Sequence, residues 1–531
     1  MAAKTVTAAE LKRRLTGTDE LALLDVREEG TFSERHLLHA RTLPLSRLEL
    51  GLAHLVPRRD TPVVLCDDGD GLAERAAARM NALGWTDVAV LQGGVGGWAA
   101  AGNEVFSGVY VPSKAFGEFV EHESGTPSVS AEELKAMMDR GEKMIVLDSR
   151  PYDEFHRMNI PTGIDCPGAE LALRVHDLAP SPDTTVVVNC AGRTRSIIGA
   201  QSLINAGIPN KVVALRNGTM GWELAGFQCE RGQTRRAGAV TAGGLARAQG
   251  VAQHVAQRFG VKTIYLDQLG PMLADTRRTT LVFDVRSPEE YEAGHLSGSR
   301  PAPGGQLVQA TDLYVGTLNA RIVLVDDNGV RATMTASWLL QMGWPDVYVL
   351  AGALLNDALE KGRYVPPVLG LDGLVTEDID PAGLKALLER GEAAVVDLAR
   401  SPAYRKGHVP GAWFAVPSRL AAGIAKVPPA RHLVLTSEDG TVARLNARAA
   451  SAARGGGVKV LAGGTAAWIA AGLPLAEGEE NMADVTDDVW LRPYERKGDQ
   501  RAAALEYLSW EVDLVAQIKR DGTTRFRHVP G

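Results

Sequence analysis

Cysteine is scarce in this sequence, with Cys66, Cys166, Cys190 and Cys229 the four among 531 residues. A fold that depends on several disulfides is therefore excluded, and the composition suits a reducing compartment. No pair of cysteines has the Cys-x-x-Cys spacing of zinc or redox sites, so we expect no metal and no cofactor. Cys166 and Cys229 are expected to be structural, with a resolving-thiol role for Cys166 as the alternative.

The sequence also lacks an excess of positive charge and long apolar runs. Its formal net charge is −7, which gives no basic footprint for nucleic acid. No apolar run approaches the length of a membrane span, and Met1–Leu15 contains no apolar core of a signal peptide. We therefore expect a cytoplasmic protein with no nucleic-acid partner and no membrane partner.

A unit of roughly 110 residues occurs four times along the chain. Each copy starts with a strand that ends in an acidic residue and closes with a short, mostly glycine-rich motif. Strands alternate with helical stretches, which predicts an α/β fold in which each copy is a small parallel sheet with helices on both faces. The strand ends are Leu24–Arg27, Leu147–Arg150, Phe283–Arg286 and Val396–Ala399, and the closing motifs are Gly93–Trp98, Asn217–Trp222, Gly352–Ala353 and Gly463–Trp468.

The repeat predicts four domains and two further segments. A linker is expected at 231–255, although Leu245–Phe259 could form an amphipathic helix that opens the third copy. A tail is expected at 479–531, in which Arg501–Lys519 form a helix with a broad apolar face. The linker divides the chain into two halves of two consecutive domains each. The domains cover residues 1–110, 120–230, 256–366 and 370–478.

The second copy contains a loop that combines a cysteine with two arginines, Cys190 to Ser196 (CAGRTRS). It follows a β-branched strand at Thr184–Asn189 and precedes a helix at Ile197–Ala206, for which Ser196 is the expected N-cap. Backbone N–H groups at such a turn point toward the sulfur, and two loop arginines add positive charge. Because both features favour the thiolate, we predict that Cys190 is a nucleophile. A buried structural cysteine is the alternative.

Each copy resembles a rhodanese domain. The resemblance rests on the Asp-Val-Arg strand end, the Gly-His-x-x-Gly turn, the cysteine loop that ends in Arg-Ser and the Gly-Gly-x-x-x-Trp motif, and it extends to about residue 478. It implies four tandem rhodanese-like domains and a thiosulfate sulfurtransferase-like enzyme. Related arsenate reductases and phosphatases have a longer loop, so the loop length disfavours those activities.

The resemblance also assigns roles. Cys190 would accept a sulfane sulfur from a small anionic donor such as thiosulfate, hold it as a persulfide and pass it to cyanide or a thiol, which a protein can also supply. A multi-domain scaffold, or a persulfide relay fed by a partner protein, is the alternative function. The substrate-binding residues implied by the loop are Ala191, Gly192, Arg193, Thr194, Arg195 and Ser196.

The other three copies depart from the pattern at the cysteine position. Aligned on the end of the apolar strand, they have Cys66, Asp326 and Ser437 there. Neither Asp326 nor Ser437 can hold a persulfide, so we predict that the third and fourth domains are inactive. Cys66 is a possible secondary site, but Asp67 and Asp68 favour its protonated form, and we expect weak reactivity at most.

Two expectations concern the surroundings of Cys190. In tandem rhodaneses the neighbouring domain covers the active pocket, which implies that domain 1 shapes the entrance and that domains 3 and 4 are a scaffold. Asp148 and Arg150 are expected to form a structural ion pair. For the tail helix, docking on the body, a dimer contact and a lid over a site all stay open.

Overall fold

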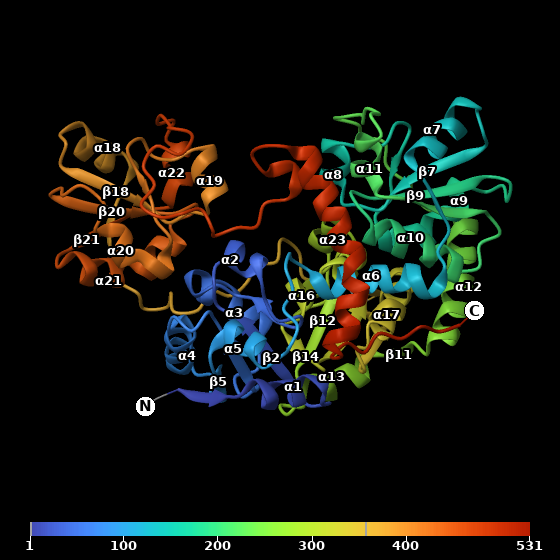
Figure 1. The fold of residues 1–531 in the computed structure, drawn as a ribbon, viewed down its shortest axis with the longest axis horizontal. Helices are drawn as coiled ribbons and strands as arrows, with labels where there is room; N and C mark the ends of the chain where they lie inside the picture. The colour runs from blue at the N-terminus through green and yellow to red at the C-terminus, as the bar shows by residue number, and fades with distance from the viewer. Residues whose placement is uncertain (1–2, 356–357, 531) are drawn as a thin grey trace.

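The computed structural model describes residues 3–355 and 358–530. All four copies fold into small parallel sheets flanked by helices, which confirms the predicted α/β class (Figure 1). The central strands are short apolar runs, such as β9 (Thr185–Asn189), in which only the first residue is partly exposed. Helices cover both faces of each sheet, and this explains why these strands are apolar along nearly their whole length rather than in alternation.

The first domain consists of β1 (Lys4–Val6), α1 (Ala8–Thr16), β2 (Leu21–Asp25), α2 (Glu29–Glu34), β3 (Arg41–Thr42), η1 (Leu45–Arg47), α3 (Leu48–Leu55), β4 (Val63–Cys66), α4 (Leu72–Ala82), β5 (Val88–Leu91) and α5 (Gly94–Ala100). Its strands have the order β1-β5-β4-β2, with β3 beside β2. Parallel pairing throughout places the end of β4, and the loop after it, at the carboxyl edge of the sheet.

The second domain consists of β6 (Ser128–Val129), α7 (Ala131–Asp139), β7 (Met144–Asp148), α8 (Tyr152–Arg157), β8 (Ile164–Asp165), η2 (Gly168–Glu170), α9 (Leu171–Leu178), β9, α10 (Thr194–Asn205), β10 (Val212–Leu215) and α11 (Gly218–Leu224). The strand order is β6-β10-β9-β7-β8. The central strand β9 ends directly before Cys190, which therefore lies at the carboxyl edge, where such sheets bind ligands.

The third domain consists of β11 (Lys262–Ile264), α13 (Leu266–Ala274), β12 (Thr280–Asp284), α14 (Pro288–Ala293), β13 (Arg300–Pro301), α15 (Gly304–Gln309), α16 (Thr311–Tyr314), β14 (Thr317–Leu318), β15 (Arg321–Val325), α17 (Val330–Gln341), β16 (Val347–Leu350) and η3 (Ala353–Leu355). Its order is β11-β16-β15-β12-β13. The short strand β14 instead pairs antiparallel with β2, so it extends the sheet of domain 1.

The fourth domain consists of β17 (Glu377–Ile379), α18 (Pro381–Glu389), β18 (Ala393–Asp397), α19 (Ser401–Lys406), β19 (Trp413–Phe414), η4 (Pro417–Arg419), α20 (Leu420–Ile424), β20 (His432–Thr436), α21 (Thr441–Arg454), β21 (Val458–Leu461) and α22 (Gly464–Ala470). The order β17-β21-β20-β18-β19 repeats that of domains 2 and 3. Four copies of one topology confirm the repeat read from the sequence.

The predicted linker at 231–255 is a linker only in its first part. Helix α12 (Ala242–Phe259) begins there because the Thr241 hydroxyl accepts a hydrogen bond from the Gly244 N–H at 2.9 Å. Its apolar residues, including Ala248 and Val255, are buried in one core with α9 and α17. The predicted helix is therefore confirmed, but it packs between domains 2 and 3 rather than opening the third copy alone.

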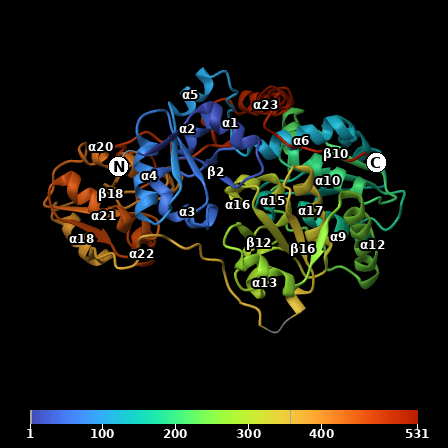
Figure 2. The same cartoon turned by 90° about the horizontal axis from the view of Figure 1, so that it is seen from below.

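The domains do not pair in chain order. Domain 2 packs on domain 3, where the Trp338 indole donates to Ser202 at 2.8 Å, and domain 4 packs on domain 1, where Ser418 donates to Glu28 at 2.7 Å. Figure 2 shows domain 4 beside domain 1 at one end of the molecule and domain 2 beside domain 3 at the other. The expectation of two halves, each built from consecutive domains, is wrong in this respect.

The tail returns to the body of the molecule. After the short turn η5 (Pro493–Glu495), helix α23 (Gln500–Asp521) lies across α6 (Val111–Ser124), the helix that joins domains 1 and 2 (Figure 1). Leu514 and Ile518 are buried there, but Leu505 is 51% exposed and Val512 50% exposed, so the apolar face is narrower than predicted. Among the described residues, no helix is long and apolar enough to cross a membrane.

Candidate active site

Cys190 lies in the turn between β9 and α10, with 2% of its surface exposed. Helix α10 begins at Thr194, earlier than predicted, so Ser196 lies in its first turn and is not the N-cap. In this position Ser196 has a different role. Its hydroxyl donates a hydrogen bond to the Cys190 sulfur at 2.9 Å, and a donor in this place stabilises negative charge on the sulfur.

The closing motif Asn217–Trp222 binds the backbone of the cysteine loop. The Thr219 N–H donates to the Cys190 carbonyl at 2.9 Å, and the Met220 N–H donates to the Ala191 carbonyl at 3.0 Å. Gly218 has a φ of 53°, and a Cβ atom there would lie 2.2 Å from the Cys190 carbonyl oxygen. Only glycine fits this contact, which explains the motif in terms of the loop it supports.

Arg195 belongs to the floor of the site. It forms a two-pronged ion pair with Glu154, at 3.0 and 2.8 Å, and also contacts the Gln306 side chain of domain 3 at 3.2 Å. Burial would lower the pKa of Arg195, but the charge of Glu154, the hydrogen bonds to it and the charge of Cys190 together raise this pKa above its usual range. In return Arg195, acting against burial, lowers the pKa of Glu154 to about 2. The guanidinium therefore stays charged close to the sulfur.

Arg193 does not supply a free charge to the cradle. Its guanidinium turns toward α6, where it forms a two-pronged pair with Glu118 at 2.7 Å and a further ion pair with Glu121. Two carboxylates thus compensate one arginine. The prediction that Arg193 and Arg195 both present charge to the donor is corrected by this geometry, because Arg193 anchors the loop to α6.

Gly192 is the point where the tail meets the loop. A Cβ atom there would lie 3.3 Å from a carboxylate oxygen of Glu511 and 3.5 Å from the ring of Tyr507, both on α23. Lys114 on α6 pairs with Glu511 at 2.8 Å and also contacts the Tyr507 hydroxyl. Burial, with Glu511 next, raises the pKa of Tyr507 well above its usual range, and the charge of Cys190 adds to this. The tail helix therefore covers the Cys190 loop.

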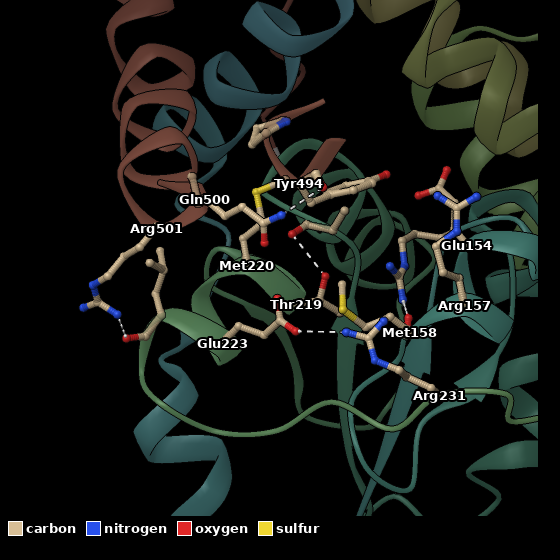
Figure 3. A pocket seen from close by; sticks show the side chains of 15 residues that line it. Glu154, Arg157, Met158, Thr219, Met220, Glu223, Arg231, Tyr494, Gln500 and Arg501 are labelled. Carbon is tan, nitrogen blue, oxygen red and sulfur yellow. Dashed lines mark hydrogen bonds and ion pairs between the residues drawn. The ribbon is translucent and has the colours of Figure 1, made fainter. Parts of the chain in front are cut away.

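A cavity of about 500 Å³ opens beside the loop at Ala191 (Figure 3). One side comes from α8 and α11 of domain 2, and the other from the tail. The expectation that domain 1 shapes the entrance is wrong, because the tail takes that position. The lining residues are Arg150, Glu154, Arg157, Met158, Ala191, Thr219, Met220, Glu223, Leu224, Arg231, Pro493, Tyr494, Gln500, Arg501 and Ala504.

Strand pairing decides which residue of domain 1 matches Cys190. In domain 2, the aspartate that ends β7 lies opposite Asn189, directly before Cys190. In domain 1, the aspartate that ends β2 lies opposite Cys66. Cys66 thus matches Asn189, and Asp67 matches Cys190, so the predicted alignment is off by one residue.

Cys66 is part of the core of domain 1 and not of its loop. It is the last residue of β4, is fully buried, and its thiol lies 3.6 Å from the Leu24 carbonyl. Burial, reinforced by the charge of Asp25, raises the pKa of Cys66 well above its usual range. The possible secondary site at Cys66 is therefore corrected to a structural thiol.

The strand register confirms Asp326 and Ser437 at the cysteine position of domains 3 and 4. In domains 1 and 3 the side chain at this position fills the cradle with its own carboxylate, which loop N–H groups bind. The acid thus occupies the anion site, in addition to the repulsion that was expected. The bonds run from Gly69 and Ala73 to Asp67 (2.8 and 2.9 Å), from Gly329 and Ala332 to Asp326 (2.7 and 3.1 Å), and from Ala443 to the Ser437 hydroxyl (3.3 Å).

The ion pair predicted between Asp148 and Arg150 is present. The guanidinium of Arg150 donates to both carboxylate oxygens of Asp148, at 2.8 and 2.7 Å, and to the Met158 carbonyl at 2.5 Å. Cys166 is fully buried in the core of domain 2, in accord with a structural role. Residues 3–355 and 358–530 contain no cluster of metal-ligating side chains.

Several residues of the site escape motif reading. Lys114 and Glu118 lie in the helix between two copies, and Tyr507 and Glu511 lie in the tail, outside the repeat. Gln306 comes from a neighbouring domain. An available signal is the charge of Lys114 and Glu118 among the mostly apolar residues that begin α6, because buried charges require partners.

Comparison with known proteins places the chain among relatives. Residues 7–101, 130–225, 266–356 and 380–471 match the family described as Rhodanese-like domain. The crystal structure of thiosulfate sulfurtransferase from Pseudomonas aeruginosa is similar over 99% of this chain and 100% of its own, with 50% identity and a TM-score of 0.96.

Two curated relatives match shorter segments. Thiosulfate sulfurtransferase GlpE from Pseudomonas paraeruginosa is 35% identical over 71 residues, which is 13% of this chain and 63% of that protein. The tRNA uridine(34) hydroxylase of Yersinia pestis is 29% identical over 96 residues, or 17% of this chain and 26% of that protein. The chain thus matches less than two thirds of the length of either.

Proposed function

Because this chain belongs to the rhodanese family, we propose that it is a sulfurtransferase that works through Cys190. The sulfur of Cys190 takes a sulfane sulfur from a small anionic donor such as thiosulfate, and sulfite leaves with the bonding electron pair. The resulting persulfide is then passed to a thiophilic acceptor, cyanide or a thiol. No cofactor takes part in either step.

One observation carries this proposal. Of the four cradles, that of domain 2 alone presents a sulfur atom, and this sulfur accepts a hydrogen bond from Ser196. Arg195, held by Glu154, adds a permanent positive charge close by. Such a site favours an anionic sulfur and an anionic donor, and it needs no general base once the thiolate has formed.

Burial of Cys190 argues for small-molecule substrates over the alternative of a relay fed by a partner protein. The cysteine is 2% exposed, and the tail lies over its loop at Gly192. A thiol carried by a rigid protein surface would have to displace α23, whereas a small donor fits the adjacent cavity.

Intact-mass spectrometry after exposure to thiosulfate tests the proposal. Wild-type protein should gain one sulfur, about 32 Da, and cyanide should remove it with release of thiocyanate. Cys190→Ser should gain nothing, while Cys66→Ser should behave as wild type because Cys66 is a core residue. Absence of any gain in the wild-type protein would refute thiosulfate as the donor.

A further inference from the structure

The cavity beside Cys190 is larger than thiosulfate requires. Its volume of about 500 Å³ lies in the range that holds organic ligands of appreciable size, about 300 to 1,000 Å³. Thiosulfate is a small inorganic ion, so the remaining space is available to the second substrate. The residues that line the cavity therefore indicate what kind of acceptor it binds.

The charge of the cavity is positive. Four arginines and two glutamates line it, and Glu154 is already engaged by Arg195. Among the described residues, no carboxylate lies within ion-pair distance of Arg157 or Arg501, and Glu223 reaches Arg231 only at 3.9 Å. These three guanidinium groups are thus available to carboxylates of a ligand.

Arg501 comes from the tail and lies at an unfavourable end of its helix. It is the second residue of α23, where a positive charge opposes the helix dipole. Its guanidinium donates to the Leu224 carbonyl of domain 2 at 2.9 Å, so this side chain connects the tail to α11 (Figure 3). The dipole of α23 therefore gives no reason for this charge, whereas the carbonyl at the C-terminal end of α11 and an anionic ligand both do.

We propose that the C-terminal tail forms the acceptor-binding wall of the Cys190 pocket, and that Arg501, together with Arg157 and Arg231, selects a small organic thiol that carries carboxylate groups. This rests on the proposed sulfur transfer at Cys190. Ala504 lies on the same wall, so the small side chain there leaves the space that the acceptor fills.

Transfer of the sulfur to a thiol requires no oxidant, reductant or other reagent. The thiolate of the acceptor attacks the outer sulfur of the Cys190 persulfide and forms a new S–S bond. The bond between that outer sulfur and the Cys190 sulfur breaks, and its electron pair stays on Cys190, which returns to the thiolate. The acceptor leaves as a persulfide.

Steady-state kinetics on the full chain test this assignment, with thiosulfate as donor and either glutathione, an anionic thiol, or cysteamine, a cationic thiol, as acceptor. Arg501→Gln should raise KM for glutathione roughly two- to fivefold, the range expected for a partly exposed ion pair, and leave kcat and the KM for cysteamine unchanged. Lys519→Gln removes the same charge from an exposed position on the same helix, outside the cavity lining, and should match wild type.

A second pair of variants tests the wall itself. Ala504→Trp should fill the cavity and raise KM for glutathione more than tenfold, whereas Ala502→Trp, exposed on the same helix, should have no effect. The proposal is overturned if Arg501→Gln has the same KM for glutathione as Lys519→Gln, or if Ala504→Trp has the same KM as Ala502→Trp. Persulfide formation at Cys190 is measured by mass on the same proteins. If the sulfurtransferase proposal is wrong, even the wild-type protein forms no persulfide; if only the acceptor assignment is wrong, the persulfide still forms.

Discussion

Besides its sulfur, the cradle of domain 2 has a hydrogen-bonding side chain that the other three cradles lack. Ser196 donates to the Cys190 sulfur, whereas the matching residues of the other copies are Ala73, Ala332 and Ala443, which can offer only their backbone N–H groups. Each cradle thus has a donor at this position, and in domain 2 the donor is a side-chain hydroxyl.

Ser196→Ala should slow persulfide formation about tenfold or more, because a hydrogen bond to a charged group contributes about 1.5 to 3 kcal/mol. The rate is measured in a single turnover with excess thiosulfate, by rapid quenching and intact mass. The fold should tolerate alanine, as three other copies contain it here. An unchanged rate would show that Ser196 does not stabilise the sulfur anion.

Asp397 lacks the arginine that pairs with the matching aspartate in the other copies. Ala399 occupies that place, and Asp397 Oδ2 has no hydrogen-bond partner among the described residues. Burial raises the pKa of Asp397 to about 7, above its value of about 3.9 in an unfolded chain. The folded state thus binds more protons between pH 4 and 7, and the free energy of unfolding falls as the pH rises through this window.

Asp397→Asn should therefore raise the free energy of unfolding by about 1 to 4 kcal/mol at pH 8 and change it little at pH 4. Urea denaturation at both pH values measures the difference, with Asp439→Asn at an exposed position as the matched control. An equal gain at the two pH values would contradict a role for the ionised carboxylate.

The residues whose placement the sequence predicted are those with a local signature. Cys190 and Arg195 stand in one short loop that the rhodanese resemblance identifies, and the Asp148–Arg150 pair is two residues apart. Cys66 was misplaced because the run Leu65-Cys66-Asp67 does not reveal which residue ends the strand. Only the pairing register, which is a property of the folded sheet, resolves that single step.

At the scale of elements, α6 and α23 are joined by a buried charge. Lys114 and Glu511 lie 2.8 Å apart, with their side chains 5% and 2% exposed. Lys114→Met would leave the carboxylate without its partner and should lower the free energy of unfolding by about 3 to 5 kcal/mol. Urea denaturation measures this change.

The double variant Lys114→Met with Glu511→Leu supplies the control for that prediction. Replacement of both charges by apolar groups removes the uncompensated carboxylate and should restore most of the lost stability. If the double variant is as unstable as the single one, shape and not charge holds the two helices together.

Apolar periodicity predicted the existence of α12 and α23 but not where they pack. Periodicity reports that a helix has an apolar face, whereas its partner is set by contacts across hundreds of residues, such as that between Gly192 and Tyr507. The half-exposed Leu505 and Val512 show the same limit, because a pattern does not state how wide the covering surface is.

At the scale of the molecule, domain 3 and the tail both contact the site in domain 2. Domain 3 reaches domain 2 through Gln306 on Arg195 and through Arg331, which pairs with Glu170 at 2.7 Å. Arg331 stands at the position that Arg195 has in domain 2, and there it binds the neighbouring domain. Domain 4 precedes the tail that covers Cys190. The four copies thus share one fold but differ in the contacts that they make.

The chain crosses from domain 3 to domain 4 by an exposed segment, in which Arg363 is accessible and Val365 is 80% exposed. Limited trypsin digestion should cut there first. The two fragments should stay together and elute with the intact protein in gel filtration, because the Gly30 N–H still binds Asp487 and α23 still packs on α6. Urea should separate them, and the nicked protein should still form the Cys190 persulfide, since no residue of the site lies at the cut. Fragments that part in native buffer would show that the covalent connection, rather than the packing, holds the tail over the active site.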